Sequence, residues 1–305
     1  MAKRCLVIGA NGFVGSYIVD ALIDAGFMVR AFDRFSRNPQ FKPSQNIELF
    51  KGDFFEDMAI SRALENIDYV FHAFSATTPS TSDADPYRDI SLNVLRNIQL
   101  FEKCSEANVK KVVYISSGGA VYGTTAEDKV VTEDDAPNPV SPYGIGKLSS
   151  EHYLEYFNRK YGLKHISYRL SNPYGARQIT KNNQGVIPTF IEKIKNNEEL
   201  PVMGDGSGSR DYIYMKDAAE IIVSTFNKDT KYTVFNLGSG VQTSLKEIID
   251  VLGSTMMLEP RVLHLEAPKT FVQKSQISID RLTSEFNIYP KTSFSEGIKQ
   301  LLQNE

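Results

Sequence analysis

The chain has 305 residues, and its 41% hydrophobic and 23% charged content is typical of a globular protein with a substantial core. The net charge is −3, the pI is near 5.9 and no block of like charges stands out, so we expect no binding to nucleic acid or to an anionic membrane. No stretch approaches the roughly 20 apolar residues of a membrane span, and the apolar run near the N-terminus is too short for a signal peptide. We therefore expect a cytoplasmic protein in which Cys5 and Cys104 are buried thiols, with no disulfide and no metal site.

Short β-rich runs alternate with helical patterns over the first two-thirds of the chain. Strands are expected at residues 5–8, 27–32, 47–50, 69–72, 111–116 and 166–170, and helices at 13–25, 59–64, 90–107 and 143–161. This alternation predicts an α/β fold with a Rossmann-type doubly wound parallel sheet. After Asn172 the pattern is less regular, which favours a smaller C-terminal α/β substrate-binding domain. The expected domains are residues 1–171 and 172–305, with residues 212–240 completing the sheet; residues 75–85 and 204–209 are expected to be flexible loops.

A glycine-rich segment follows the first predicted strand directly and opens the first predicted helix. Residues 9–15 have the sequence Gly-Ala-Asn-Gly-Phe-Val-Gly. Gly9 permits the tight turn, Gly12 lets the backbone approach a pyrophosphate at the helix N-terminus, and Gly15 lets the helix pack on the strand. A glycine triplet alone is weak evidence, but the flanking strand and helix support a dinucleotide-binding site.

An acidic residue, Asp33, lies at the end of the second predicted strand, 18 residues after Gly15. A carboxylate at this place accepts hydrogen bonds from the ribose hydroxyls and repels a 2′-phosphate, which favours NAD over NADP. Arg34 and Arg37 lie nearby, so NADP as the cofactor stays an alternative, although we interpret both arginines as solvated loop charges.

A Tyr-x-x-x-Lys pattern is formed by Tyr143 and Lys147 at the start of a predicted helix. Residues four apart share one face of a helix. An ammonium beside the phenol, together with the positive charge of an oxidised nicotinamide, would lower the pKa of the tyrosine from its usual value near 10. The phenolate could then take a proton from a sugar hydroxyl while hydride leaves to the cofactor.

These motifs are accompanied by others over nearly the whole chain. They are Gly52-Asp53, Asn93, Ser116-Ser117, Val121-Tyr122-Gly123, Asn172-Pro173-Tyr174-Gly175, Gly204-Asp205-Gly206, Arg210-Asp211-Tyr212 and Asn236-Leu237-Gly238-Ser239-Gly240. Together they resemble the extended short-chain dehydrogenase/reductase family, in its branch of nucleotide-sugar epimerases, dehydratases and reductases, with UDP-glucose 4-epimerase as a representative.

The resemblance implies that Tyr143 is the general base and acid and that Lys147 orients the nicotinamide ribose. It also implies an NAD site that comprises Gly9, Gly12, Phe13, Val14, Gly15, Asp33, Asp53, Phe54, Ala73, Asn93, Ser116, Tyr143, Lys147 and Tyr174. The implied nucleotide-sugar site comprises Thr77, Asn172, Val186, Arg210, Lys274 and Ile277. In that site the planar guanidinium of Arg210 would pair with the diphosphate.

The sequence departs from the family at the usual catalytic Ser or Thr, four residues before the tyrosine of the Val-Tyr-Gly motif. Gly118 occupies that position. Ser117 is one residue away and would face the other side of an extended strand unless the two glycines re-aim it. We predict that Ser117 supplies the catalytic hydroxyl, with a water, Thr124 or Thr125 as alternatives. Because the following residues cannot protonate a leaving hydroxyl, dehydration is not favoured.

A second departure concerns the arginine that the family often places ten residues before the aspartate matching Asp280. Thr270 occupies that position, with Lys269 and Lys274 nearby, and a lysine would supply the charge without the planar fork. Ile277 matches a position that selects sugars by size, and its intermediate side chain does not decide the substrate.

The leading hypothesis is an NAD-dependent nucleotide-sugar 4-epimerase, acting on a UDP-hexose or a UDP-N-acetylhexosamine by transient oxidation at C4. An NAD(P)H-dependent reductase of a nucleotide 4-keto-6-deoxy sugar is the alternative with the same motifs. A non-catalytic dinucleotide sensor is the alternative from another class.

The family further suggests a homodimer through a four-helix contact between residues 93–107 and 143–161 of two subunits. Of the four histidines, His72 ends a buried strand and is interpreted as a packing residue.

Overall fold

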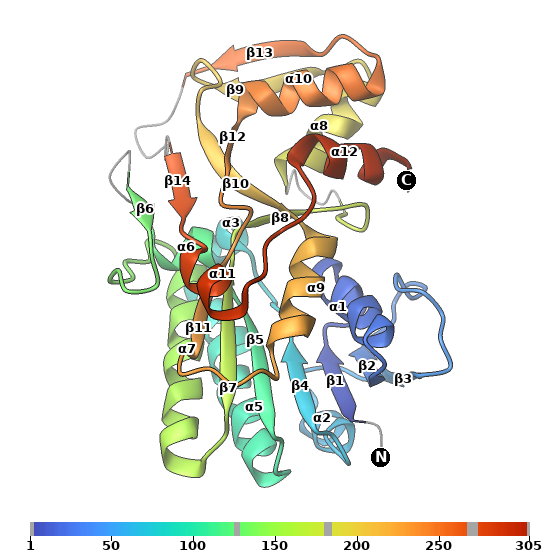
Figure 1. The fold of residues 1–305 in the computed structure, drawn as a ribbon, viewed down its shortest axis with the longest axis vertical. Helices are drawn as coiled ribbons and strands as arrows, with labels where there is room; N and C mark the ends of the chain where they lie inside the picture. Colours follow the sequence, from blue (N-terminus) through green and yellow to red (C-terminus); the bar gives the residue numbers. More distant parts are fainter. Residues whose placement is uncertain (1–2, 125–128, 180–184, 267–273, 304–305) are drawn as a thin grey trace.

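The structure, a computed structural model, describes residues 3–124, 129–179, 185–266 and 274–303 (Figure 1). In this part of the chain seven parallel strands form one sheet in the order β11-β7-β5-β4-β1-β2-β3. The strands are β1 (Arg4–Ile8), β2 (Met28–Asp33), β3 (Ile47–Lys51), β4 (Tyr69–His72), β5 (Lys111–Ser117), β7 (His165–Leu170) and β11 (Val234–Leu237). The predicted doubly wound sheet is therefore confirmed, and its strand order reverses between β1 and β4, where such sheets bind ligands beyond their carboxyl ends.

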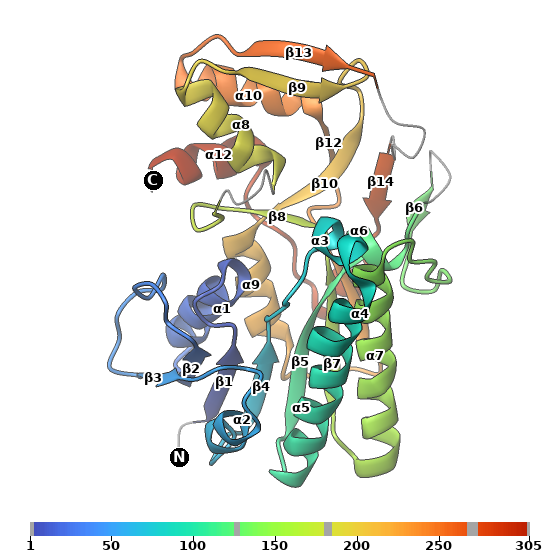
Figure 2. The same cartoon turned by 180° about the vertical axis from the view of Figure 1, so that it is seen from behind.

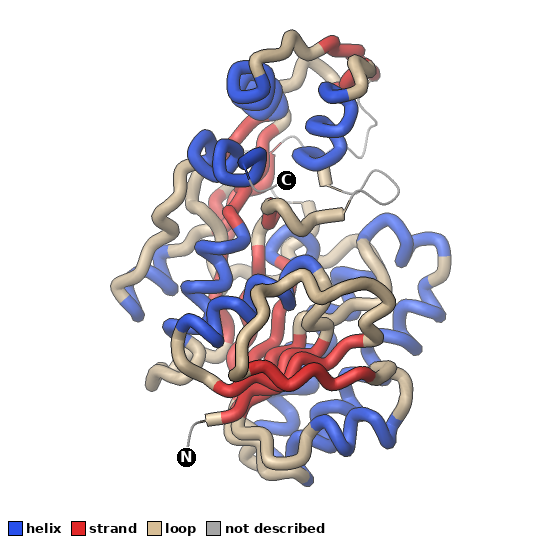
Figure 3. The backbone as a smooth tube through the Cα atoms, turned by 90° about the vertical axis from the view of Figure 1, so that its right-hand side faces the viewer, coloured by secondary structure: helices blue, strands red, loops and turns tan. Residues whose placement is uncertain are grey.

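Helices cover both faces of this sheet because successive strand residues point to opposite sides (Figures 2 and 3). In β1, Cys5 and Val7 pack in one core with the helices α1, α9 and α11, whereas Leu6 and Ile8 pack in a second core with α2, α5 and α7. The first set is α1 (Phe13–Asp24), α9 (Met215–Thr225) and α11 (Asp280–Phe286), and the second is α2 (Asp57–Ala63), α5 (Leu95–Glu106) and α7 (Pro142–Tyr161). Near-continuous apolar strands are what this two-sided burial requires.

The helix α7, which bears the Tyr-x-x-x-Lys motif, has well-defined ends. The hydroxyl of Ser141 accepts a hydrogen bond from the amide of Gly144 at 3.1 Å, and Pro142 occupies the first turn. Gly162 ends the helix in the left-handed conformation, with φ of 74°. The helix lies against β5.

The remaining elements form a second, smaller lobe, seen at the top of Figure 1. Its sheet elements are β6 (Val130–Val131), β8 (Asn172–Tyr174), β9 (Glu199–Met203), β10 (Ser209–Tyr214), β12 (Gln242–Ser244), β13 (Arg261–Leu265) and β14 (Lys274–Ile277). Its helices are α8 (Val186–Lys195), α10 (Leu245–Met256) and α12 (Phe294–Gln303). A separate apolar core joins these helices to β8, β9 and β10. From β10 the chain returns through α9 to β11, the edge strand of the large sheet, within the predicted range 212–240.

Two predicted segments differ from the structure. Residues 75–85, expected to be a flexible loop, contain the helix α3 (Pro79–Ala84), because Thr78 forms a capping box with Thr81 and Pro79 starts the helix. The helix expected at 90–107 begins earlier, as α4 (Pro86–Asp89), and passes through a π-helical turn, η1 (Ile90–Val94), before α5. A short helix, α6 (Gly118–Val121), follows β5. No helix of the described residues has both the length and the apolar character that crossing a membrane requires.

Candidate active site

The glycine-rich turn between β1 and α1 has the close contacts that its glycines predict. A Cβ atom on Gly15 would lie 2.1 Å from the carbonyl oxygen of Gly9, and one on Gly9, whose φ is +80°, would lie 3.0 Å from the backbone of Phe74. Gly12 occupies the N-cap of α1 and has no side chain to cover the amides of the first turn. These amides and the helix dipole form a cradle that fits a dinucleotide pyrophosphate.

A cleft of about 1020 Å³ begins at this turn and runs along the carboxyl ends of the strands. The predicted cofactor residues that line it are Gly9, Gly12, Phe13, Val14, Asp33, Asp53, Phe54, Ala73, Ser116, Tyr143 and Lys147. Ser117 and Thr77 line it as well. The cleft therefore joins the glycine turn to the Tyr-x-x-x-Lys pair, as binding of an extended dinucleotide requires.

Three predicted cofactor residues do not line this cleft. Gly15 packs under the turn, and Asn93 lines a small adjoining space. Tyr174 is 1% exposed and lies in the core of the smaller lobe, with its ring centroid 5.3 Å from that of Phe294. Because residues alternate along β8, Pro173 faces the cleft and Tyr174 faces away from it. The prediction of a cofactor contact at Tyr174 finds no support in this geometry.

The side chains of Tyr143 and Lys147 both point inward from α7. The ammonium of Lys147 donates a hydrogen bond to the carbonyl of Ile115 at 2.8 Å and lies 5.5 Å from the centroid of the Tyr143 ring. A second ring, that of Tyr114, lies 5.0 Å from the same ammonium. Lys147 is thus fixed between α7 and the end of β5, beside the phenol.

The hydroxyl of Ser117 lies beside Tyr143 on the wall of the cleft. Burial raises the pKa of Tyr143 to about 12, and the Ser117 hydroxyl acts in the opposite direction. Burial likewise lowers the pKa of Lys147 to about 8, while the charges of Glu151 and Asp89 act to raise it. The lowered pKa that the sequence predicts includes the positive charge of an oxidised nicotinamide beside the phenol, which is not among the causes of this raised value, so it stays a prediction.

Gly118 does not face the cleft. A Cβ atom there would lie 3.0 Å from both the carbonyl oxygen of Arg169 and the Cδ1 atom of Ile277. A serine at this position would therefore point into a small core formed by Val121, Tyr122, Val131 and Ile277. The structure places the hydroxyl of Ser117, the last residue of β5, beside Tyr143 instead. Of the alternatives, Thr124 does not line the cleft, and Thr125 lies outside the described residues.

The predicted substrate residues are divided between the cleft and the smaller lobe. Thr77 lines the cleft, while Asn172, Arg210 and Lys274 lie on the adjoining strands β8, β10 and β14. The Asn172 amide donates to the carbonyl of Asp211 at 2.9 Å, and half-buried Arg210 donates to the carbonyl of Ser209 at 2.7 Å.

Like Asn172, Arg210 and Lys274, the other two predicted substrate residues do not line the cleft. Val186 begins α8, and Ile277 is 4% exposed within the small core behind Gly118. Lys269 and Thr270 lie outside the described residues. The contact of Ile277 with a sugar stays a prediction, and the structure places this side chain behind Gly118 because β14 pairs with β6.

One buried carboxylate near the catalytic pair was missed from the sequence. Asp89 is fully buried, accepts a hydrogen bond from the hydroxyl of Thr77 and another from the amide of Asn93 at 2.9 Å. A Cβ atom on Gly146 would lie 3.0 Å from its Oδ2 atom, so the carboxylate faces α7 between Tyr143 and Lys147. In the sequence, Asp89 could have been noticed because it lies four residues before Asn93. It directly precedes the π-helical turn that contains Asn93.

A second missed carboxylate, Glu151, lies one turn after Lys147 on α7. It accepts a hydrogen bond from Ser116 at 2.5 Å and pairs with the guanidinium of Arg169 at 2.7 Å, with both charged side chains almost fully buried. The guanidinium also donates to the hydroxyl of Tyr122 at 2.8 Å. This network ties α7 to β5 and β7 behind the catalytic residues. In the sequence, Glu151 could have been recognised because it lies four residues after Lys147 and therefore shares its helix face.

His72 agrees with its interpretation as a packing residue. Its Nε2 atom lies 2.6 Å from the Oδ1 atom of Asn97, and burial lowers its pKa to about 3. The imidazole is therefore neutral near pH 7. Among the described residues, no group of three or more histidine, cysteine or acidic side chains could hold a metal ion.

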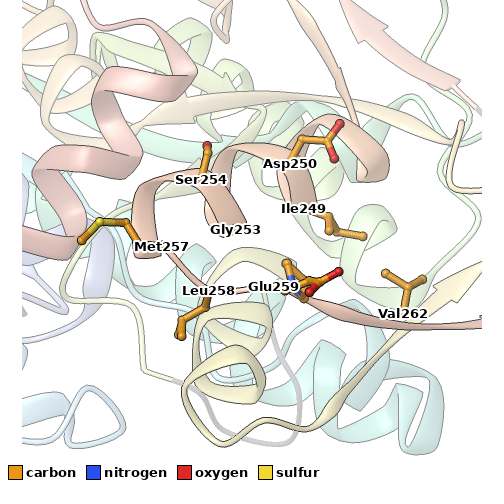
Figure 4. Close-up of a pocket in the computed structure, with 9 residues that line it drawn as sticks. Ile249, Asp250, Gly253, Ser254, Met257, Leu258, Glu259 and Val262 are labelled. Carbon is orange, nitrogen blue, oxygen red and sulfur yellow. The ribbon is translucent and has the colours of Figure 1, made fainter.

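A second hollow of about 530 Å³ lies on the smaller lobe, between α10 and the start of β13 (Figure 4). Its lining residues are Ile249, Asp250, Gly253, Ser254, Met257, Leu258, Glu259, Pro260 and Val262. This set contains two carboxylates and no cationic side chain, so it does not suit a diphosphate. The cleft at the sheet is the candidate active site.

Comparison with known proteins defines the class to which this fold and site belong. The model of the NAD dependent epimerase/dehydratase family matches residues 5–238. The chain therefore belongs to this family and is an NAD-dependent enzyme of this kind.

Individual relatives extend the similarity over the full chain. The putative UDP-glucose 4-epimerase of Methanocaldococcus jannaschii is 31% identical, over 97% of this chain and 96% of the relative. The dTDP-4-dehydro-6-deoxyglucose reductase of Escherichia coli is 29% identical, over 98% and 96%. The structure of the Thermus thermophilus UDP-glucose 4-epimerase in complex with NAD superimposes with a TM-score of 0.90 at 29% identity, covering 99% of this chain and 98% of that one.

Proposed function

We propose that this protein is an NAD-dependent nucleotide-sugar 4-epimerase that acts on a UDP-hexose or a UDP-N-acetylhexosamine. The observation that carries the proposal is the group of Ser117, Tyr143 and Lys147 on the wall of the dinucleotide cleft. The similarity to UDP-glucose 4-epimerases from two organisms supports the choice of reaction.

The roles of the three side chains follow from their contacts. NAD held in the cleft would supply the hydride acceptor for oxidation of the sugar carbon and a positive charge that favours the phenolate. Tyr143 removes the proton of the C4 hydroxyl and later gives it back. Ser117, which lines the cleft with Tyr143, would donate a hydrogen bond to the phenolate. Lys147, held by the carbonyl of Ile115, keeps its charge beside the Tyr143 ring.

The diphosphate of the substrate would lie toward the smaller lobe. Arg210 and Lys274 lie on the paired strands β10 and β14, which supports a role for both cations in binding the phosphates. Asn172, on the other side of β10, would complete this part of the site.

A reductase of a nucleotide 4-keto-6-deoxy sugar is the second candidate, favoured by the similarity to the Escherichia coli reductase. It would use the same tyrosine as a proton donor but would consume external NADPH or NADH. A sensor without catalysis is not favoured, because Tyr143 and Lys147 are both positioned at the cleft.

The test uses the protein as purified, incubated with UDP-glucose, UDP-galactose, UDP-N-acetylglucosamine or UDP-N-acetylgalactosamine and followed by NMR. An epimerase interconverts one of these pairs without added cofactor, and acid release of its ligands yields NAD. Turnover only of a 4-keto-6-deoxy sugar, with dependence on added NADPH, would establish the reductase. Absence of turnover with either class, although NAD is bound, would contradict both enzymes.

A homodimer and a cytoplasmic location complete the proposal. The outer faces of α4, η1, α5 and α7 lie side by side (Figure 2) and expose large apolar side chains, namely Tyr87, Ile90, Leu95, Ile145, Tyr153 and Tyr156. Such a face supports the four-helix contact. Light scattering would give twice the chain mass, and Ile145→Glu would give monomers.

Two buried free thiols, Cys5 and Cys104, support a reducing compartment.

A further inference from the structure

Asn11, in the glycine-rich turn, makes five hydrogen bonds with residues 33–40. Its side-chain amide donates to the carbonyls of Arg37 and Asn38 at 3.1 and 3.3 Å, and its Oδ1 atom accepts from the amide of Gln40 at 2.8 Å. Its backbone amide donates to the carboxylate of Asp33 at 3.0 Å, and its carbonyl accepts from the Arg37 guanidinium at 2.9 Å. Asn11 is 4% exposed, so these bonds are shielded from water.

The loop that Asn11 holds, residues 34–40, has a constrained backbone. Phe35 adopts a φ of 47°, in the left-handed region that a bulky side chain rarely enters. Its ring packs edge-on against Phe41, with the centroids 6.4 Å apart. Such a conformation persists only where surrounding contacts fix it. The bonds from Asn11 on one side and the aromatic contact on the other provide them.

This loop forms the end of the cleft where the adenosine ribose of a dinucleotide binds, because it follows Asp33 at the tip of β2. Arg34 and Arg37 both line the cleft there. Arg34 is exposed, whereas Arg37 is half-buried and its guanidinium is engaged by the carbonyl of Asn11. A guanidinium is the group that would bind the 2′-phosphate of NADP. Arg37 is thus directed to the glycine turn.

We propose that Asn11 is a cofactor-specificity residue that holds residues 34–40 so that Asp33 faces the ribose hydroxyls and Arg37 is kept from a 2′-phosphate. Discrimination against NADP then has two sources, the repulsion by Asp33 and the retention of Arg37. The proposal concerns the dinucleotide alone, so it holds whether the reaction is an epimerisation or a reduction.

The test is a double-mutant cycle with four proteins: wild type, Asn11→Ala, Arg37→Ala and the double variant. Each, as purified, is equilibrated with equal concentrations of NAD and NADP, and native mass spectrometry gives the ratio of bound dinucleotides. Asn11→Ala keeps the backbone carbonyl that binds Arg37 but removes the three side-chain hydrogen bonds that hold the main chain of residues 37–40. We expect the loosened loop to let Arg37 reach a 2′-phosphate and to raise the share of NADP over NAD about tenfold. Arg37→Ala alone should leave the ratio within about twofold, and the double variant should return to it.

Two controls keep the result interpretable. Asn38→Ala, in the same loop, removes an exposed side chain while keeping the carbonyl that Asn11 binds, and should leave the ratio unchanged. Asn11→Ser, whose hydroxyl can keep one hydrogen bond to the loop, replaces Asn11→Ala in the test if that variant does not fold. Two outcomes overturn the proposal: an unchanged ratio in a folded, NAD-binding Asn11 variant, or a large loss of NADP in Arg37→Ala alone.

Discussion

The two ends of the active site are built in different ways. At the dinucleotide end, main-chain amides and closely packed glycines of one continuous segment, residues 9–15, form the cradle. At the sugar end, the proposed site draws on Asn172, Arg210 and Lys274, which lie on the neighbouring strands β8, β10 and β14. The first end depends on backbone geometry and tolerates no added atoms, whereas the second depends on side-chain charge. Substitutions should therefore separate cofactor retention from substrate affinity.

The largest effect is expected at the junction of the two ends. Tyr143→Phe removes the phenol that we propose exchanges the proton, so kcat should fall by about 10³-fold. Bound NAD should stay, because the phenol is not part of the glycine cradle. Turnover and released NAD are measured on the same preparation. Tyr153→Phe, on an exposed face of the same helix, is the matched control. Near-normal turnover in Tyr143→Phe would exclude the assigned role.

At the dinucleotide end, Gly15→Ala should destabilise the fold by about 3 kcal/mol and abolish NAD retention. The added methyl group would lie 2.1 Å from a backbone oxygen that cannot move without opening the turn. Thermal denaturation and the NAD content give the two readouts. Gly119→Ala is the control, since a Cβ atom there meets no atom within 4 Å. Full NAD occupancy in Gly15→Ala would disprove the described cradle.

At the sugar end, Arg210→Ala should raise KM for the UDP-sugar roughly 10- to 100-fold while leaving NAD bound. The loss is that of a charge-assisted hydrogen bond to phosphate. Arg261→Ala, in the same lobe but paired at the surface with Glu199, should change KM little. A loss of NAD from Arg210→Ala, with KM unchanged, would show that Arg210 contributes to dinucleotide binding and not to substrate binding.

The smallest effect is a shift in pH dependence. Lys147, with a pKa of about 8, loses its charge as the pH rises through that value, so activity should decline on the alkaline side. The negative charge of Asp89 raises this pKa; Asp89→Asn should therefore move the decline to lower pH by about half a unit to one unit. The profile of kcat/KM against pH measures the shift. Asp83→Asn, on the exposed side of α3, should leave the profile in place.

The parts that the sequence predicts well are those in which adjacent residues make one feature. The glycine turn, the helix after it and the Tyr143–Lys147 pair fall in this class, because their geometry follows from local backbone periodicity. The large sheet follows from the alternation of apolar strands and helices.

The details that the sequence leaves open depend on which way a side chain points after the chain has packed. Ser117, predicted to supply the hydroxyl, lines the cleft with Tyr143, whereas Gly118 faces the small core because α6 starts directly after β5. Tyr174 faces the smaller core because β8 pairs with β10. The pKa direction of Tyr143 depends on its burial, which no spacing of residues reveals.

The buried ion pair of Glu151 with Arg169 constrains how this scaffold can change. Removing either partner leaves a charge without compensation in the interior, which costs about 3–5 kcal/mol, whereas exchanging both for apolar groups of similar volume can be nearly neutral. The two residues lie on α7 and β7, so a variant that alters one must alter the other at the same time. Random diversification of the catalytic helix would therefore find few folded variants unless β7 is diversified with it.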